Sequence, residues 1–333
     1  MRKLLNWLVV GAILWSGYWG IAAWALHQGV SAWFIERTRQ GWLAEHDGLG
    51  SSGYPLHQKL EMTRPVLADP GTGIAWRADW LSLNSAALSP LQQRLQFPST
   101  AQRISYFDRT LVLTAADMKV ALDLAPGQAL ALDDLNLQTG TWRVQEAGLD
   151  LAAAQSAELR MTKTAAPETY ALTLALPDLS LPALQRSYLS GNDGLPDRFE
   201  AFELRATVQF DTAWDRRALE LHRPQPQRVE LDSVRAQWGP MHLRAAGSLT
   251  VDTGGIPTGE IMIQAQDWQQ MLTLAEHSGL LAAHMRGTLE QVLAVLAGRG
   301  GHPDRLEMRL TFARGNMMLG PLPLGPAPRF IIR

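Results

Sequence analysis

The sequence predicts an α+β protein, mainly β, in which an N-terminal transmembrane helix precedes a large curved antiparallel sheet with two late helices. Three observations support this prediction. Residues 4–26 contain no charged side chain, and a helix of about 20 such residues crosses the hydrocarbon core of a bilayer. Most of the later chain alternates apolar and polar residues with the period of two that is typical of half-buried strands. Two segments near the C terminus show helical periodicity after capping-box patterns.

The apolar run carries aromatic residues whose polar tips favour the headgroup level of a membrane. We expect five of them to lie at the membrane interface: Trp7, Trp15, Tyr18, Trp19 and Trp24. Ala12, Ser16 and Gly20 form a small-xxx-small ridge through which two such helices can pack closely. The plainer interpretation is that these small residues simply face lipid.

The charges around the run indicate its orientation. Arg2 and Lys3 precede it, which favours a cytoplasmic N terminus and a periplasmic body. A cleaved signal peptide is the main alternative, because residues 23–25 match the small-x-small cleavage pattern. The run exceeds the 7 to 15 residues of a typical signal core, and aromatic residues crowd the cleavage region. We therefore expect a retained anchor, giving a single-pass inner-membrane protein with a periplasmic body.

Composition divides the chain into residues 1–46, the membrane anchor and its helical extension, and residues 47–333, a periplasmic β-rich body. A hydrophobic content of 46% provides a real core. Without Arg2 and Lys3, 28 of the 30 basic residues remain against 32 acidic ones, and no basic block is present, so we expect no nucleic-acid partner. The absence of cysteine rules out disulfides and thiolate nucleophiles.

The body divides at turn residues into short alternating segments. We predict strands at residues 56–66, 74–80, 118–124, 130–132, 135–137, 142–144, 157–162, 170–176, 202–210, 234–238, 243–251, 261–265 and 306–312. Residues 84–102 are less regular, and a small helix is expected at residues 183–189. Two longer helices are expected to start at Asp267 and Thr288. Because most strands have one polar face, the sheet should be antiparallel with one side in water.

No motif in the chain predicts catalysis, a cofactor or a metal. Residues 48–53 match G-x-G-x-x-G, but a dinucleotide site needs a strand before this loop and a helix after it. Here the predicted order is reversed, so a flexible hinge is the better interpretation. His277 and His284 lie on neighbouring helical turns without a metal-binding spacing.

The acidic pairs are also better explained by structure than by chemistry. Asp133 with Asp134, and Asp211 with Asp215, are of the kind that is common at strand ends and turns. A hydrolase would need two carboxylates at a set distance in a cleft. We therefore expect a protein that is not an enzyme.

The predicted sheet has more apolar face than two short helices can cover. The uncovered part must close on itself as a filled sandwich or barrel, or shelter something apolar. The nearby membrane makes a lipid the natural ligand, with an apolar face that includes Leu204, Val208, Leu249 and Ile261. The alternative is a non-catalytic scaffold that docks a membrane-protein partner through exposed strand edges or the small-residue ridge.

Three segments carry a resemblance to a known family: residues 15–19 (WSGYW), residues 53–55 (GYP) and residues 319–326 (LGPLPLGP). In these the chain resembles the bacterial family catalogued as domain of unknown function 2125. The resemblance runs nearly end to end and implies an inner-membrane-anchored envelope protein of Gram-negative bacteria, with no catalytic residues to carry over. Residues 247–263 are also similar in rhythm to AsmA-related anchored β-rich envelope proteins, some associated with lipid handling.

Overall fold

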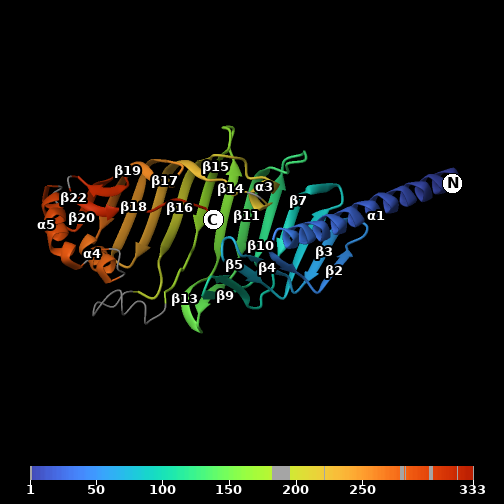
Figure 1. The fold of residues 1–333 in the computed structure, drawn as a ribbon, viewed down its shortest axis with the longest axis horizontal. Helices are drawn as coiled ribbons and strands as arrows, with labels where there is room; N and C mark the ends of the chain where they lie inside the picture. The colour runs from blue at the N-terminus through green and yellow to red at the C-terminus, as the bar shows by residue number, and fades with distance from the viewer. Residues whose placement is uncertain are drawn as a thin grey trace. The chain divides into compact units, whose positions relative to one another are not determined.

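The computed structural model describes residues 2–181, 196–220, 222–277, 281, 283–299, 303–320 and 322–332. The chain forms two compact units, Met1–Asp133 and Asp134–Arg333, which we call the N-terminal unit and the C-terminal unit. An N-terminal helix, antiparallel strands and two late helices confirm the predicted fold class (Figure 1). The small helix expected at residues 183–189 lies outside the described residues.

The N-terminal helix α1 spans Arg2–Arg39 and is long and apolar enough to cross a membrane. It ends several residues before the expected extension to residue 46. Gly41 adopts a φ of 89°, and its N–H donates to the Thr38 carbonyl at 3.0 Å while the Trp42 N–H donates to the Arg37 carbonyl at 3.0 Å. This pair of bonds is a Schellman cap, which glycine favours because it has no Cβ.

The strands of the N-terminal unit form two antiparallel groups. The first has the order β1 (Leu43–Glu45), β4 (Val66–Asp69), β5 (Ile74–Arg77), β8 (Gln102–Tyr106) and β9 (Arg109–Ala115). The second has the order β2 (Gly48–Ser52), β3 (His57–Thr63), β6 (Trp80–Ala86), β7 (Ser89–Gln96) and β10 (Lys119–Leu124).

Two segments of this unit are more regular than the sequence indicated. The glycine-rich segment expected to be a hinge is strand β2, which pairs with β3 from Gly48 opposite Thr63 to Ser52 opposite Lys59. Cross-strand hydrogen bonds outweigh the low strand propensity of glycine here. Residues 84–102, expected to be irregular, contain most of the β6–β7 hairpin.

The C-terminal part of α1 packs against strands of both groups. Phe34 of α1 packs with Ala44 and Met62, and Val30, Trp33, Leu49, Leu67 and Leu81 surround them. This cluster holds α1 against strands of the N-terminal unit, to which the helix itself belongs.

The C-terminal unit contains ten strands that pair in antiparallel order. They are β11 (Leu132–Thr139), β14 (Ala157–Lys163), β15 (Thr169–Ala175), β16 (Ala201–Phe210), β17 (Pro226–Trp238), β18 (Met241–Val251), β19 (Pro257–Gln266), β20 (Arg305–Ala313), β21 (Asn316–Leu319) and β22 (Leu322–Pro326). Strands β12 (Trp142–Glu146) and β13 (Leu149–Ala154) pair as a hairpin that belongs to the other sheet, and α3 (Arg216–Glu220) follows β16. Figure 1 shows β14 to β20 side by side. The strand order has two ends, so the sheet is open.

The two late helices that were predicted are present, and they cover one end of this sheet. They are α4 (Trp268–His277) and α5 (Ala283–Arg299). Trp268, Leu272, Leu289, Leu293 and Leu306 form the centre of the cluster that joins them to the sheet. Helix α5 starts five residues before the expected Thr288, so Gly287 lies inside the helix.

Candidate functional site

A row of apolar side chains crosses eight strands of the C-terminal unit. Each member stands directly opposite the next in the strand register. The row consists of Leu137, Leu159, Leu174, Leu204, Val234, Ala245, Ile263 and Met308, and we call it the apolar row. Every member is half-buried. The middle of this face therefore keeps apolar surface accessible on these strands, up to β20, where Met308 packs against the cluster of α4 and α5.

The same face is closed near both ends of the strands. At one end Tyr170, Val208, Leu249 and Phe312 are buried, and the Phe210 ring packs edge-on against Tyr170 at 6.0 Å. At the other end the buried residues are Trp238, Met241, Ala265 and Leu306. Phe199 stacks on Trp238 at 4.4 Å, and Met271 and Leu274 of α4 pack against the same tryptophan cluster. The accessible apolar surface is thus a strip bounded on two sides by packed side chains.

The four residues predicted for an apolar face do share one face of the sheet. Leu204 and Val208 lie four residues apart on β16, and the register of the neighbouring strands places Leu249 and Ile261 on the same side. Leu204 and Ile261 are half-buried, whereas Val208 and Leu249 are buried. The difference follows from position, since Val208 and Leu249 lie toward the covered strand ends.

The opposite face of the same strands carries charged and polar side chains. Its corresponding row contains Glu203, Arg235, Arg244, Gln264 and Glu307, again paired directly across the strands. All five are exposed. The sheet therefore has one charged, wet face and one apolar face, as the alternating sequence pattern requires.

The N-terminal unit has a shorter apolar row of its own. Leu60, Leu83, Leu95 and Val120 stand opposite one another on β3, β6, β7 and β10. Leu60 is buried and the other three are half-buried.

The anchor residues predicted for the membrane interface fall into two groups. Trp7 and Trp24 are exposed. Trp15, Tyr18 and Trp19 instead donate hydrogen bonds to backbone carbonyls of the N-terminal unit, at Pro55, Ala87 and His57 respectively. The second half of the apolar run therefore lies against the body, a contact that the sequence did not reveal.

The small-residue ridge is partly occupied in the same way. The Ser16 hydroxyl donates to the Ala12 carbonyl at 2.8 Å and also lies 2.8 Å from the Tyr54 hydroxyl, which therefore acts as the donor in this second bond. Ala12 and Gly20 are exposed. A second helix could not pack closely along the whole ridge without displacing Tyr54.

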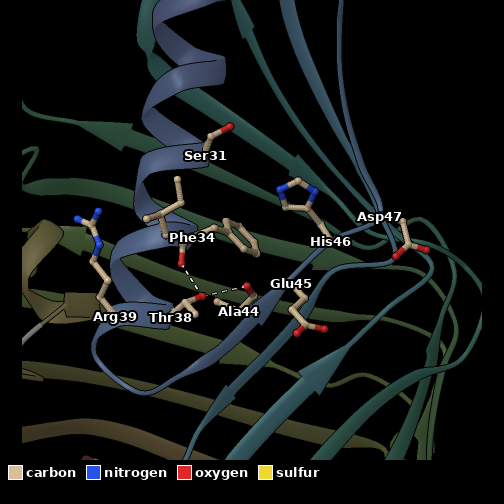
Figure 2. A pocket seen from close by; sticks show the side chains of 9 residues that line it. Ser31, Phe34, Thr38, Arg39, Ala44, Glu45, His46 and Asp47 are labelled. Carbon is tan, nitrogen blue, oxygen red and sulfur yellow. Dashed lines mark hydrogen bonds between the residues drawn. The ribbon is translucent and has the colours of Figure 1, made fainter.

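A pocket of about 570 Å³ lies where α1 ends and β1 begins (Figure 2). Its lining is Ser31, Phe34, Ile35, Thr38, Arg39, Ala44, Glu45, His46 and Asp47. The Thr38 hydroxyl bonds to the Phe34 and Ala44 carbonyls at 3.0 and 3.3 Å, and the His46 ring packs edge-on against Phe34 at 5.0 Å. These contacts join helix to strand, and the charged groups of Arg39, Glu45 and Asp47 are exposed. The pocket supplies no nucleophile paired with a base.

A family comparison can now be set beside this geometry. A family model described as an uncharacterized protein conserved in bacteria, DUF2125, matches residues 19–328. The chain belongs to this family. No curated protein matches it. The match starts at Trp19 within α1 and covers both units. The Trp19 bond and the cluster around Phe34 therefore lie inside the matched region of the DUF2125 protein, whereas Trp15, Ser16 and Tyr18 precede it.

The acidic pair Asp211 and Asp215 has a structural role in the DUF2125 protein. Asp215 caps α3, because its carboxylate accepts the Arg217 backbone N–H at 2.8 Å. Hydrogen bonds from the Arg217 side chain hold the pKa of Asp215 below its ordinary value, against the opposing effect of burial. Burial raises the pKa of Asp211, but hydrogen bonds from the Gln225 backbone, His222 and Thr212 outweigh it, so its pKa is also lowered.

These lowered pKa values show that both carboxylates are held charged, which does not suit a general acid. A cavity of about 170 Å³ beside them is lined by residues of the same turn. Among the described residues, no group of three or more His, Cys, Asp and Glu is placed to hold a metal ion.

Sequence reasoning missed the apolar row of the DUF2125 protein as a continuous feature. The alternation on each strand was visible, but the alignment between strands depends on register. Directly opposed ends of the hairpins, such as Trp238 with Met241 and Val251 with Pro257, fix that register. Short turns between alternating segments were the signal that could have revealed it.

Proposed function

We propose that the DUF2125 protein is a non-catalytic, membrane-anchored envelope protein that holds lipid acyl chains on the apolar row, with its body in the periplasm. The supporting observation is the row itself, eight apolar side chains in direct register that all remain half-buried. A face of this kind on a soluble body is costly unless something apolar covers it.

The dimensions of the row suit acyl chains. Neighbouring strands are spaced by about 4.8 Å, so seven steps between eight strands span roughly 34 Å. One acyl chain extends through about half of a 30 Å hydrocarbon core, or roughly 15 Å. The row is thus long enough to accept an acyl chain laid across the strands, and each buried CH₂ would contribute about 0.8 kcal/mol.

The periplasmic location is supported by the basic residues Arg2 and Lys3, which precede the apolar part of α1. The lipid source is then the membrane that holds the anchor. No chemical step is assigned, because the pocket of Figure 2 and the Asp211–Asp215 turn both make structural contacts.

Photo-crosslinking in intact membranes tests this proposal. A benzophenone amino acid is placed at Leu204, Ala245 or Ile263 on the apolar row. The matched controls are Arg205, Arg244 and Gln264, which neighbour these positions along the same strands but face the other way. We expect phospholipid adducts, detected by mass spectrometry of the purified protein, from the first three positions only.

Two other outcomes would contradict lipid holding. Equal lipid labelling from both faces would indicate nonspecific contact with membrane. Protein adducts from the apolar row, without lipid adducts, would favour the alternative of a scaffold that docks a membrane-protein partner.

A further inference from the structure

Four side chains of α1 make hydrogen bonds to two strand connections of the N-terminal unit. Trp15 Nε1 donates to the Pro55 carbonyl at 3.0 Å, Trp19 Nε1 to the His57 carbonyl at 2.8 Å, and the Tyr18 hydroxyl to the Ala87 carbonyl at 2.8 Å. The fourth bond joins the hydroxyls of Ser16 and Tyr54. The connections are residues 53–57, between β2 and β3, and residues 86–89, between β6 and β7; we call them the two tips.

The tips expose large apolar side chains. Tyr54 is 55% exposed, Leu56 67% and Leu88 76%. The tips, residues 53–57 and 86–89, contain no Asp, Glu, Lys or Arg. Turns of soluble proteins are usually polar, so this composition indicates an apolar environment around the tips.

The length of α1 places that environment in the bilayer. Residues 3–14 are all exposed, and among the described residues Trp15 is the first of the helix to donate a hydrogen bond to the strand connections. From Leu4 to Trp15 the helix rises only about 16 Å, and to Trp19 about 22 Å. If the hydrocarbon core begins at Leu4, its thickness of about 30 Å extends beyond both Trp15 and Trp19, where the tips are attached to the helix.

Several backbone carbonyls of the tips already have hydrogen-bond donors, as an apolar environment requires. Non-helical backbone is tolerated at membrane depth only where its polar groups are satisfied. Within the tips, the Gly53 and Leu56 carbonyls accept hydrogen bonds from the His57 and Ala87 N–H groups, both at 2.9 Å. The Pro55, His57 and Ala87 carbonyls accept the three bonds from α1 described above.

We infer that the two tips insert into the hydrocarbon region of the leaflet nearest the body, docked on α1, so that Leu56 and Leu88 contact lipid acyl chains. The partner is the bilayer itself. The aromatic side chains Trp15, Tyr18 and Trp19 then act as donors that satisfy the inserted backbone. This inference does not depend on whether the apolar row of the C-terminal unit holds lipid.

The natural chain has no cysteine, so single-cysteine variants give site-specific labels without further changes. The full chain carrying Leu56→Cys or Leu88→Cys is labelled with a fluorophore and reconstituted into phosphatidylcholine vesicles. Controls are Gln92→Cys and Asp123→Cys, exposed positions on β7 and β10 of the same unit. Lipids brominated along the acyl chain act as membrane quenchers, and iodide acts as the aqueous quencher.

We expect bromolipid to remove fluorescence from the labels at residues 56 and 88, and iodide to remove it from those at residues 92 and 123. Quenching of the tip labels by iodide alone would overturn the inference. Unchanged circular dichroism of each variant establishes that the body is folded. A double variant, Leu56→Asp with Leu88→Asp, provides a second test, because carboxylates in the leaflet should lower the fraction of protein recovered in vesicles. Recovery equal to that of Gln92→Asp would also overturn it.

Discussion

Arg37 lies at the end of α1 between two indole rings. It is 2% exposed, and its guanidinium carbon stands 5.7 Å from the Trp33 ring centre and 5.8 Å from that of Trp42. A charged side chain at the end of a helix would ordinarily face water, but the turn at Gly41 brings Trp42 back over Arg37. Cation–π attraction and the aliphatic stem of arginine allow this burial.

Replacing Arg37 by methionine should lower the free energy of unfolding of the N-terminal unit by about 1–2 kcal/mol, because two desolvated cation–π contacts are lost. Denaturant unfolding in detergent, followed by tryptophan fluorescence, measures this. Arg39→Met is the control: Arg39 is exposed and pairs with Glu36 at 3.6 Å, and an exposed pair of this kind contributes little stability. Equal effects at the two positions would contradict the role assigned to Arg37.

The Asp215 cap predicts a dependence of stability on pH. Its pKa is lowered by the Arg217 hydrogen bonds, so the charged form is favoured in the folded state. The resulting stability is present above the ordinary pKa of 3.8 and is lost as pH falls through the lower folded value.

Asparagine still caps a helix but has no charge to attract Arg217, so Asp215→Asn should lower the free energy of unfolding at neutral pH. The difference from the natural protein should shrink below pH 3.8. Urea unfolding across this range is the measurement. Arg217→Gln removes the partner and should show the same trend, with little further loss in the double variant. If the stability difference between Asp215→Asn and the natural protein grew as the pH fell, the lowered pKa assigned to Asp215 would be wrong.

At the scale of elements, the contact between β18 and β19 depends on Gly247. A Cβ at this position would lie 2.7 Å from the Ile261 Cα and closer still to the Glu260 carbonyl oxygen. Since these are backbone atoms, the strands cannot adjust by rotating a side chain.

Gly247→Ala should accordingly destabilise the C-terminal unit by about 1–3 kcal/mol, as overpacking does in other cores. The midpoint of urea unfolding would shift to lower concentration. Ser248→Ala, the next residue along β18, is exposed and should leave the midpoint nearly unchanged. An unaltered midpoint for Gly247→Ala would mean that the strands can separate at small cost.

The last strand, β22, also limits how partners can dock. It is the final strand in its sheet order and contains Pro323 and Pro326. Proline has no N–H to offer a further strand. Addition of a partner strand at this edge, one route for the scaffold alternative, is therefore disfavoured.

At the scale of the whole molecule, the orientation in the membrane stays a prediction. A periplasm-dependent reporter joined after residue 60 should be active, and a cytoplasm-dependent reporter at the same place should be silent, because Arg2 and Lys3 favour a cytoplasmic N terminus. The opposite pattern would reverse the orientation. Sequencing the N terminus of the mature protein distinguishes a retained anchor from a cleaved signal peptide, and a start near Leu26 would exclude the bilayer contact inferred for the tips.

The sequence by itself determined the element types and the polarity of each strand. An uncharged run predicts a helix because side chains in lipid must be apolar, and alternation predicts a strand because successive side chains point to opposite faces. Residues 202–210 and 306–312 were found in this way, and β16 and β20 include them.

Only the tertiary structure decided which residues meet. Register aligned Leu204 with Val234 and continued the apolar row through Ile263 to Met308. Contacts between residues some 40 to 70 positions apart bound Trp15 to Pro55 and Tyr18 to Ala87. Local patterns carry no information about such distant partners, because any strand with the same alternation could pair with any other until turns and packing select one arrangement.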